Sequence, residues 1–433
     1  MKFVFEDLDN IRNFTNLEYI NNVNESRFCP APIVNSVRNR LHFNGYANRN
    51  NLKSKFQLEK LTETSTDYIY AVGVHNGPTS WTGIGEKEVN IFDIIPTKVL
   101  SDMRTKKAFF LIDQSLEGYQ TDWLWKFFHD NCKKYDVPCS SIIYVTGNLI
   151  VEDSYNKWLE NNRVSDKIKV IGYPHFEHDT FGSSIDLKFR KKPLPSLEAQ
   201  LKYKKDNLSK IKSFACLNKR IRSHRVWFYT KLFHNKLLDK GLVSMNNFDT
   251  NHGFSMEGKS IDEKLRKQAN DILPLMVHNT PNDELDDSFY ISRFNPEVCL
   301  QTWCSVVSEA HFIDTDDTLF ISEKTFKPIL CSQPFLILGN KGSIGAMKDM
   351  GFDTFDEFID QSYDNYSTHE RFNRLIKSIK KIEKIENKYE WFLKMSDSIE
   401  HNKEVLRKRS GINLPEAFVE LHKYYTQRHS NVL

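Results

Sequence analysis

The chain has 433 residues, of which 39% are hydrophobic and 13% aromatic, and its formal net charge is +3. This length allows two or three domains with cores of their own, which excludes a disordered protein. The near balance of charge gives no reason to expect a nucleic-acid-binding protein, although a local basic face remains open. No run of about 18 apolar residues and no signal peptide is evident, so we expect a cytoplasmic protein with no membrane partner.

The seven cysteines are scattered over the chain, several of them within apolar runs. This pattern is typical of reduced core cysteines, and neither a Cys-x-x-Cys pair nor a Cys/His cluster indicates a zinc site. The abundance of Asn, Lys, Ile and Phe is typical of an AT-rich genome.

Residues 1–66 are polar and rich in Asn, and they show no regular pattern. We interpret them as an irregular N-terminal extension or as a segment that contacts a substrate. Their basic residues include Arg38, Arg40, Arg49, Lys53 and Lys55.

Residues 67–200 alternate apolar strands with amphipathic helices. Strands are expected at 68–74, 108–112, 141–145 and 168–173, and helices at 91–100, 123–134 and 155–162. This alternation predicts a parallel sheet in a Rossmann-like α/β domain. The charged stretch 179–207 is the expected linker to a second domain.

Polar side chains follow three of these strands, where ligands bind in parallel sheets. The pairs are His75 with Asn76, Asp113 with Glu117, and Thr146 with Asn148. Any single pair is more often an ordinary turn than a site. As general bases we single out Asp113 and Glu117, with His75 as the next candidate, because proton removal from a hydroxyl needs a carboxylate or an imidazole.

A second domain, 201–405, opens with a strand at 213–217 and the basic turn from Asn218 to Arg225. Arginines at a helix start are usually solvated, and they oppose the helix dipole. A bound anion would remove this conflict, so Arg220 or Arg225 is a candidate phosphate ligand. Asn218 is a candidate for holding a base or a phosphate oxygen.

The most informative stretch runs from 308 to 355. Ser322 is the expected N-cap of a helix whose first turn holds Glu323 and Lys324. A helix N-terminus with a lysine favours phosphate, and Glu323 offers acceptors for a ribose diol. An apolar strand at 334–339 and a second short helix at 343–350 follow. The remaining sequence predicts helices over 368–409 and 414–425.

The stretch 308–355 resembles the nucleotide-sugar site of GT-B glycosyltransferases, and most closely that of the α-1,3-fucosyltransferase family. The matching residues are Glu309, Phe320, Ser322, Glu323, Lys324 and Pro334 to Gly339. Bacteriophage-encoded glycosyltransferase-like proteins carry a similar run, SEKTFKP…PFLILGN. The resemblance covers about the second half of the chain.

This resemblance implies two Rossmann-like domains that face each other across a cleft, with a C-terminal helix, 406–433, that crosses back to the first domain. It also implies that Arg220 or Arg225 contacts the donor diphosphate and that Glu309 lies near the sugar. A salt-bridged structural role for Glu309 is the alternative.

We therefore expect a glycosyltransferase that uses a UDP- or GDP-linked sugar and no metal cofactor, because Arg and Lys can neutralise the leaving diphosphate. Asp314-Thr315-Asp316 has the spelling of a metal motif but lies in a polar insert. The acceptor hypotheses are a hydroxymethylated base in double-stranded phage DNA, a glycan and a protein. DNA would need a basic groove, for which Lys202, Lys204 and Lys205 are candidates. A non-catalytic nucleotide-binding or structural phage protein is the alternative of a different class.

Overall fold

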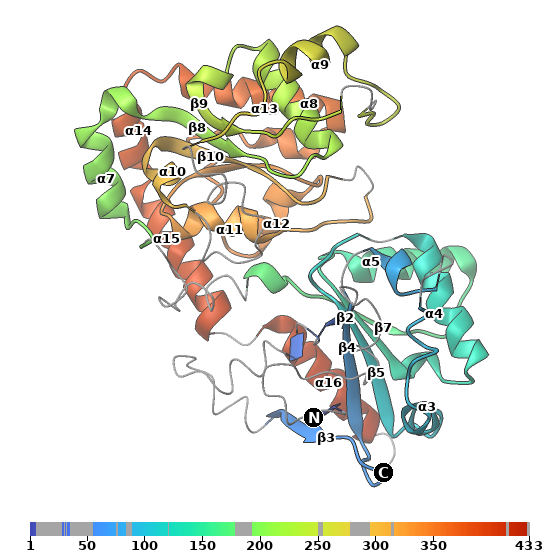
Figure 1. Cartoon of the computed structure of the whole chain (residues 1–433). Coiled ribbons are helices and arrows are strands. Elements are labelled where there is room, and N and C mark those ends of the chain that lie inside the picture. Colours follow the sequence, from blue (N-terminus) through green and yellow to red (C-terminus); the bar gives the residue numbers. More distant parts are fainter. Residues whose placement is uncertain are drawn as a thin grey trace. The chain divides into compact units, whose positions relative to one another are not determined.

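The structure is a computed structural model that describes residues 1–5, 28–29, 31, 33–34, 55–74, 77–83, 89–119, 121–177, 193–249, 254–277, 295–312, 316–412 and 415–430. The chain forms two compact units. Unit 1 contains residues 1–179, 317–320 and 411–433, and unit 2 contains residues 180–316 and 321–410. Each unit is built on its own parallel sheet (Figure 1).

Unit 1 has a sheet in the order β3-β1-β4-β5-β6-β7, parallel throughout, with the short β2 antiparallel to β4. Its strands are β1 (Lys2–Phe5), β2 (Phe28–Cys29), β3 (Gln57–Lys60), β4 (Tyr68–Val74), β5 (Ala108–Gln114), β6 (Ile142–Thr146) and β7 (Lys169–Gly172). Its helices are α3 (Thr97–Arg104), α4 (Asp122–Lys134), α5 (Val151–Asn162) and α16 (Glu416–Ser430), with 3-10 turns η2 (Pro78–Ser80) and η3 (Cys139–Ser141).

Alternate residues of the strands in unit 1 enter two separate cores. Tyr70, Phe110 and Tyr144 pack in the core that α3, α4 and α5 cover. Ile69 and Phe109 belong to the other core, which α16 covers with apolar side chains from its first three turns. Because helices cover both faces, β4, β5 and β6 are buried along their whole length, which is why their sequences are continuously apolar.

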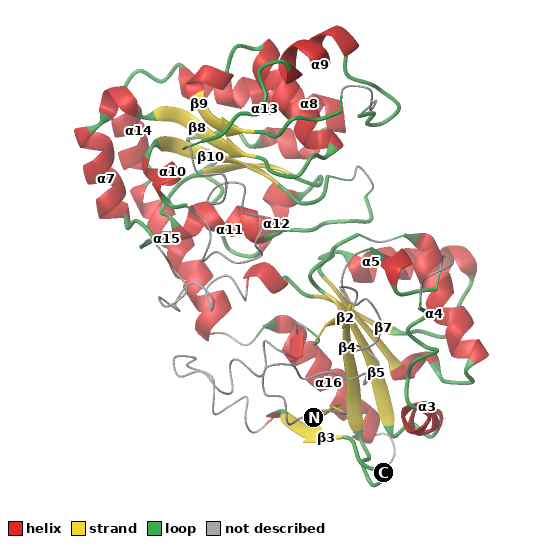
Figure 2. Cartoon of the chain, viewed as in Figure 1, coloured by secondary structure: helices red, strands yellow, loops and turns green. Residues whose placement is uncertain are grey.

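Unit 2 has a four-stranded parallel sheet in the order β11-β10-β8-β9, with helices on both faces (Figure 2). Its strands are β8 (Lys212–Leu217), β9 (Gly241–Ser244), β10 (Thr302–Ser308) and β11 (Phe335–Leu338). Its helices are α7 (Leu197–Asp206), α8 (Ser223–His234), α9 (Glu263–Asn270), α10 (Glu297–Leu300), α11 (Glu323–Leu330), α12 (Ser343–Asp349), α13 (Thr368–Glu383), α14 (Lys388–Lys394) and α15 (Ser396–Arg407), with 3-10 turns η5 (Leu208–Lys210), η6 (Leu238–Lys240) and η8 (Ser362–Asn365) and a π-helical turn η9 (Lys408–Ile412).

The α/β class with two parallel-sheet units is confirmed, and most of the expected strands are found within a residue or two. The structure also shows features that the sequence pattern did not predict. Strands β1 and β3 place parts of 1–66 inside the first sheet, and α7 lies within the expected linker. The helix expected at 91–100 is α3, which begins at Thr97, and the region 368–409 is divided into α13, α14 and α15.

Among the described residues, none of the helices is both long enough and apolar enough to span a membrane.

Candidate donor site in unit 2

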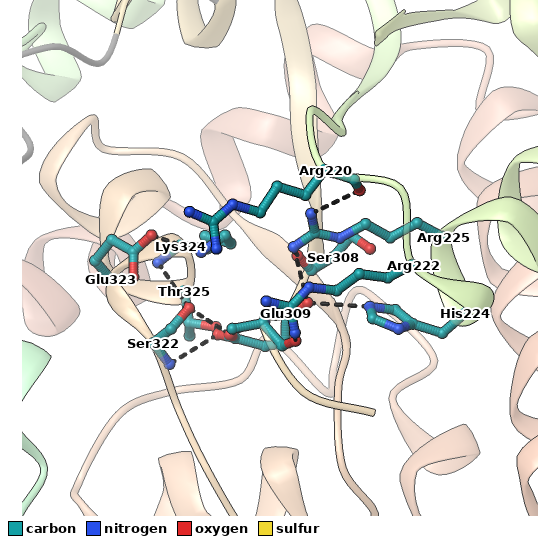
Figure 3. Close-up of polar contacts among 11 residues, drawn as sticks. Arg220, Arg222, His224, Arg225, Ser308, Glu309, Ser322, Glu323, Lys324 and Thr325 are labelled. Carbon is teal, nitrogen blue, oxygen red and sulfur yellow. Dashed lines mark hydrogen bonds and ion pairs between the residues drawn. The ribbon is translucent and has the colours of Figure 1, made fainter. Parts of the chain in front are cut away.

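The candidate site lies at the carboxyl edge of the sheet in unit 2. The chain leaves β8 for β9 on one side and then returns to β10 on the other, so the ends of β8 and β10 form the switch point of this sheet. In open parallel sheets, ligands bind beyond the strand ends at such a point. The turn 218–222 follows β8 and Glu309 follows β10, so two of the predicted segments meet there (Figure 3).

Three arginines lie between the end of β8 and the first turn of α8: Arg220 and Arg222 in the connecting turn and Arg225 in the helix. Arg225 is 4% exposed and donates to the main-chain oxygens of Ser308 at 3.3 Å and Glu309 at 3.1 Å. Arg222 donates to the main-chain oxygen of Ala310, and Arg220 is exposed. These carbonyl oxygens orient the guanidinium groups without neutralising their charge. The turn is therefore held against the end of β10 by neutral acceptors.

His224 is the buried neighbour of these arginines. Its Nε2 lies 3.1 Å from the main-chain oxygen of Glu309, so this nitrogen donates. Burial, and then the charge of Arg225, lower the pKa of His224 well below its usual value. His224 is therefore neutral at pH 7. It helps to hold the start of α8 against the end of β10 and adds no positive charge to the site.

Glu309 is fully buried and holds the start of helix α11 through Ser322 and Thr325. One carboxylate oxygen accepts from the main-chain N–H of Ser322 at 3.2 Å and from the hydroxyl of Thr325 at 2.5 Å. The other accepts from the main-chain N–H of Ala310 at 2.9 Å and from the Ser322 hydroxyl. Ser322 is the N-cap residue, as predicted. This arrangement favours a structural role for Glu309 over a place beside the sugar. The partners of its carboxylate among the described residues are neutral N–H and hydroxyl groups, whereas the structural alternative predicts a salt bridge.

The N-termini of the three helices at this edge differ. Glu309 occupies that of α11, and Asp364 accepts from the main-chain N–H groups of Ile344 at 3.0 Å and Gly345 at 3.4 Å in α12. Helix α8 has no side-chain cap, because its N-cap residue is Arg222. The phosphate at the N-terminus of α11 therefore stays a prediction: an internal carboxylate, Glu309, lies beside that helix start, whereas α8 has no side-chain cap.

Glu323 and Lys324 form an ion pair on the first turn of α11, with the Lys324 Nζ 2.6 Å from a carboxylate oxygen. Burial opposes ionisation of Glu323, but the charges of Lys324 and Lys327 outweigh it and lower the pKa of Glu323. The pair is therefore charged at pH 7. Lys324 is partly exposed, and in Figure 3 the guanidinium group of Arg220 points toward it.

Two buried oxygen atoms at the strand ends have no hydrogen-bond partner among the residues that the structure describes. They are Oδ1 of Asn218, after β8, and Oγ of Ser308, the last residue of β10. The Asn218 amide nitrogen lies 3.3 Å from the sulfur of Cys216. The amide oxygen is therefore the atom of this side chain that lacks a hydrogen-bond partner among the described residues. An unmet buried polar atom costs about 1–3 kcal/mol, which a bound polar molecule would recover.

In unit 1, Asp113 is the penultimate residue of strand β5 and is fully buried. Its carboxylate accepts from the main-chain N–H of Ile33 at 2.6 Å and of Ser115 at 2.9 Å. Burial raises the pKa of Asp113 to about 6, although these hydrogen bonds act in the opposite direction. A carboxyl group with this pKa can exchange a proton near neutral pH.

The other base candidates differ in how far they can be placed. Glu117 lies partly buried in the turn after β5, and its main-chain oxygen accepts from the N–H of Gly147 at 2.9 Å and the hydroxyl of Thr146 at 3.2 Å. His75 and Asn76 lie outside the described residues.

Residues 317–320 belong to unit 1, which no sequence pattern indicated. The Asn148 side chain holds this segment, donating to the main-chain oxygen of Asp317 at 2.8 Å and accepting from the N–H of Leu319 at 2.9 Å. Phe320 lies so close to Gly118 and Gly147 that a Cβ on either would approach its ring to 2.5 Å. The expected polar pair Thr146 and Asn148 is thus partly engaged by the chain itself.

Arg222, His224 and Ser308 were not among the predicted site residues. Each is a sequence neighbour of a predicted one, so the strand-and-turn position was the available signal. Residue type alone could not show that Arg222 and His224 anchor the turn.

The described residues contain no group of three His, Cys, Asp or Glu side chains that could hold a metal ion. Asp314 lies outside the described residues, and Asp316 pairs with Lys341 at 3.1 Å. The prediction that Lys204 contributes to a basic groove for DNA is wrong. Lys204 is fully buried and donates to the main-chain oxygens of Cys299 at 2.9 Å and Thr302 at 2.7 Å. It is therefore a core residue and cannot contact DNA.

No protein-family model and no curated protein matches the sequence. Among solved structures, the chain is similar to an α,α-trehalose-phosphate synthase (UDP-forming) from Burkholderia vietnamiensis, with 11% identity and a TM-score of 0.33 over 75% of this chain and 70% of that one. It is also similar to an α,α-trehalose 6-phosphate synthase from Burkholderia multivorans, with 9% identity and a TM-score of 0.32 over 79% of each chain. Likenesses of this size carry no argument about activity, so the site must be interpreted from its own residues.

Proposed function

We propose that the chain is a glycosyltransferase that moves a sugar from a nucleotide-diphosphate sugar to a hydroxyl acceptor and binds the donor in unit 2. The observation that supports this best is the cationic turn at the switch point of the sheet. Arg220, Arg222 and Arg225 lie there beside an uncapped helix N-terminus. A fixed positive cluster of this kind suits a phosphate or diphosphate.

The same cluster suits the chemistry of the leaving group. Breaking the bond between sugar and phosphate places additional negative charge on the departing nucleotide diphosphate. Guanidinium groups and the Lys324 ammonium stabilise this charge as it develops. The proposal therefore needs no metal ion for the leaving group.

The remaining donor contacts follow from the acceptor groups at this edge. Glu323 is charged and would accept from a ribose diol. The unpartnered oxygens of Asn218 and Ser308 would accept from a base or from sugar hydroxyl groups. Glu309 contributes by holding the start of α11, and with it Glu323 and Lys324, in place.

For the acceptor side we propose Asp113 as the general base, because its pKa of about 6 lies close to neutral pH. Glu117 and His75 are the alternatives. The acceptor classes remain a hydroxymethylated base in phage DNA, a glycan and a protein. The burial of Lys204 removes one cation that the DNA hypothesis had used.

A non-catalytic nucleotide-binding protein is the second candidate. The observation in its favour is the complete burial of Asp113, both of whose oxygens accept main-chain hydrogen bonds. A carboxylate held in this way would have to become accessible before it could act as a base.

The test is release of nucleoside diphosphate from UDP- and GDP-sugars by the wild type, Lys324→Ala and Lys348→Ala. Lys348 is a matched control because it lies on the surface of α12 in an ion pair with Asp356. Glycosyl transfer predicts release by the wild type and the control but not by folded Lys324→Ala. Binding of a nucleotide sugar by the wild type without any release would support the non-catalytic candidate instead.

A further inference from the structure

A cluster of reactive side chains lies at the amino end of β6, the end opposite to Thr146. Cys132 lies on the last turn of α4, His129 lies one turn earlier, and Cys139 begins η3 directly before β6. A tight turn after α4, in which the main-chain N–H of Val137 donates to the oxygen of Cys132 at 2.9 Å, brings the two cysteines to the same place. Both are free thiols.

The His129 ring is fixed and aimed at Cys139. Its Nδ1 lies 3.5 Å from the Cys139 sulfur, and its Nε2 lies 2.9 Å from the Tyr155 hydroxyl. That hydroxyl accepts from the main-chain N–H of Ile168 at 3.1 Å, so its own proton is available to Nε2. The proton of a neutral His129 is then on Nδ1, which donates to Cys139. Trp158 stacks on the ring at 5.3 Å and holds this orientation.

These contacts favour the thiolate of Cys139. The Cys132 thiol lowers the pKa of Cys139 most, and His129 adds to this, which brings it to about 5 although burial and the charge of Asp166 act in the opposite direction. The pKa of Cys132 is raised, by Cys139 and by burial. At pH 7 a thiolate nucleophile therefore lies beside a protonated thiol.

We propose that Cys139 is an oxidant-sensitive modification site that attacks hydroperoxides and is then closed by Cys132 into a disulfide. The Cys139 sulfur bonds to one peroxide oxygen, the O–O bond breaks, and the leaving oxygen takes a proton to form water or an alcohol. The Cys132 sulfur then attacks the sulfenic acid, and the hydroxyl group leaves as water. Two thiols lose two electrons and two protons, and the peroxide accepts them.

Four further cysteines provide internal controls. Cys216, Cys299, Cys304 and Cys331 are buried, and burial raises the pKa of Cys216 and of Cys304 to about 12. Selective reaction at Cys139 in the folded protein is therefore expected. The cluster contains none of the residues assigned to the donor site or proposed as a base, so this inference is independent of the proposed function.

The first experiment measures alkylation of Cys139 by iodoacetamide between pH 6.5 and 8.5, with peptide mass spectrometry as the readout. An ordinary thiol with a pKa of about 8.5 reacts roughly 50-fold faster at the upper pH. The Cys139 rate should change less than threefold, and His129→Phe, which keeps the stacked ring but removes the Nδ1 proton, should make it steeper. A roughly 50-fold rise in the wild type would overturn the proposal.

The second experiment treats the wild type and Cys132→Ser with hydrogen peroxide. We expect a wild-type peptide that joins Cys132 to Cys139 and has lost two hydrogens, and a sulfenic acid at Cys139 of Cys132→Ser that dimedone traps. Sulfenic acid that persists in the wild type would contradict the role of Cys132, and no oxidation at Cys139 would contradict the site as a whole.

Discussion

Two fully buried carboxylates, Asp113 and Glu309, lie at the carboxyl ends of parallel strands in different units, and their surroundings differ. Glu309 accepts four hydrogen bonds, three of them from Ser322 and Thr325 at the start of α11. Asp113 accepts two main-chain hydrogen bonds, and burial raises its pKa to about 6. The comparison shows that two carboxylates at strand ends can have different surroundings: those of Glu309 favour a structural role, and those of Asp113 leave it a candidate base. The hydrogen-bond donors around each one decide between these roles.

The largest expected effect is the loss of stability in Glu309→Ala. Removing this carboxylate leaves the buried hydroxyl groups of Ser322 and Thr325 without their acceptor, and hydrogen bonds to a charged group contribute about 1.5–3 kcal/mol each. Urea unfolding should show a loss of about 4 kcal/mol. Glu404→Ala, which removes an exposed glutamate paired with Arg407, is the control and should change stability by less than about 1 kcal/mol. A stability of Glu309→Ala equal to that of the wild type would indicate a ligand role instead.

The second effect is a dependence of stability on pH that comes from Asp113. Its native pKa of about 6 lies above the ordinary value of 3.8. The native state therefore binds the proton more tightly, and the stability that this adds is complete below about pH 4 and is lost as the pH rises through about 6. Between pH 4 and pH 7, the wild type should lose about 2–3 kcal/mol of unfolding free energy relative to Asp113→Asn.

A difference between these two proteins that stays constant from pH 4 to pH 7 would show that Asp113 does not titrate there. It would then lose its place as the preferred base to Glu117 or His75. If the difference changes as expected and Asp113 is the base, the kcat/KM of the wild type should rise with pH through about 6.

The third prediction concerns how residues 317–320 pack against the rest of unit 1. Gly118→Ala would place a Cβ within 2.5 Å of Phe320. Overpacking of this kind costs about 1–3 kcal/mol. In a double-mutant cycle, the cost of Gly118→Ala should be smaller by at least about 1 kcal/mol when Phe320 is already replaced by Ala. The control is Gly77→Ala, because nothing lies within 4 Å of its Cβ position. Additive effects would mean that Phe320 does not pack against Gly118.

The smallest effect concerns Arg220, the exposed arginine of the turn after β8. Arg220→Ala should weaken binding of a nucleoside diphosphate about tenfold, because it removes one charge-assisted contact, with little change in unfolding free energy. Isothermal titration compared with the exposed control Lys348→Ala measures this. Equal affinities in the two variants would remove Arg220 from the site.

Strands buried on both faces were the easiest elements to predict, because apolar runs such as 68–74 have one dominant interpretation. Strand β1 has only four residues, and β10 is buried but its apolar residues are interrupted by Thr302, Ser305 and Ser308, so neither shows a continuous apolar run. Residues 317–320 join unit 1 through Asn148 and two distant glycines, which no local pattern records. The Ser322 cap was predictable from local spacing, but its engagement by Glu309 depends on how β10 and α11 meet in space.

The most direct test of the donor site is a thermal-shift panel with UDP, GDP, CMP, ADP and their sugars on the wild type, Lys324→Ala and Lys348→Ala. The account predicts that one diphosphate stabilises the wild type and Lys348→Ala, by about 2.7 kcal/mol at a hundredfold excess over Kd, and that Lys324→Ala loses this gain. No stabilisation of the wild type by any nucleotide, or equal stabilisation of Lys324→Ala, would contradict the assignment of the site.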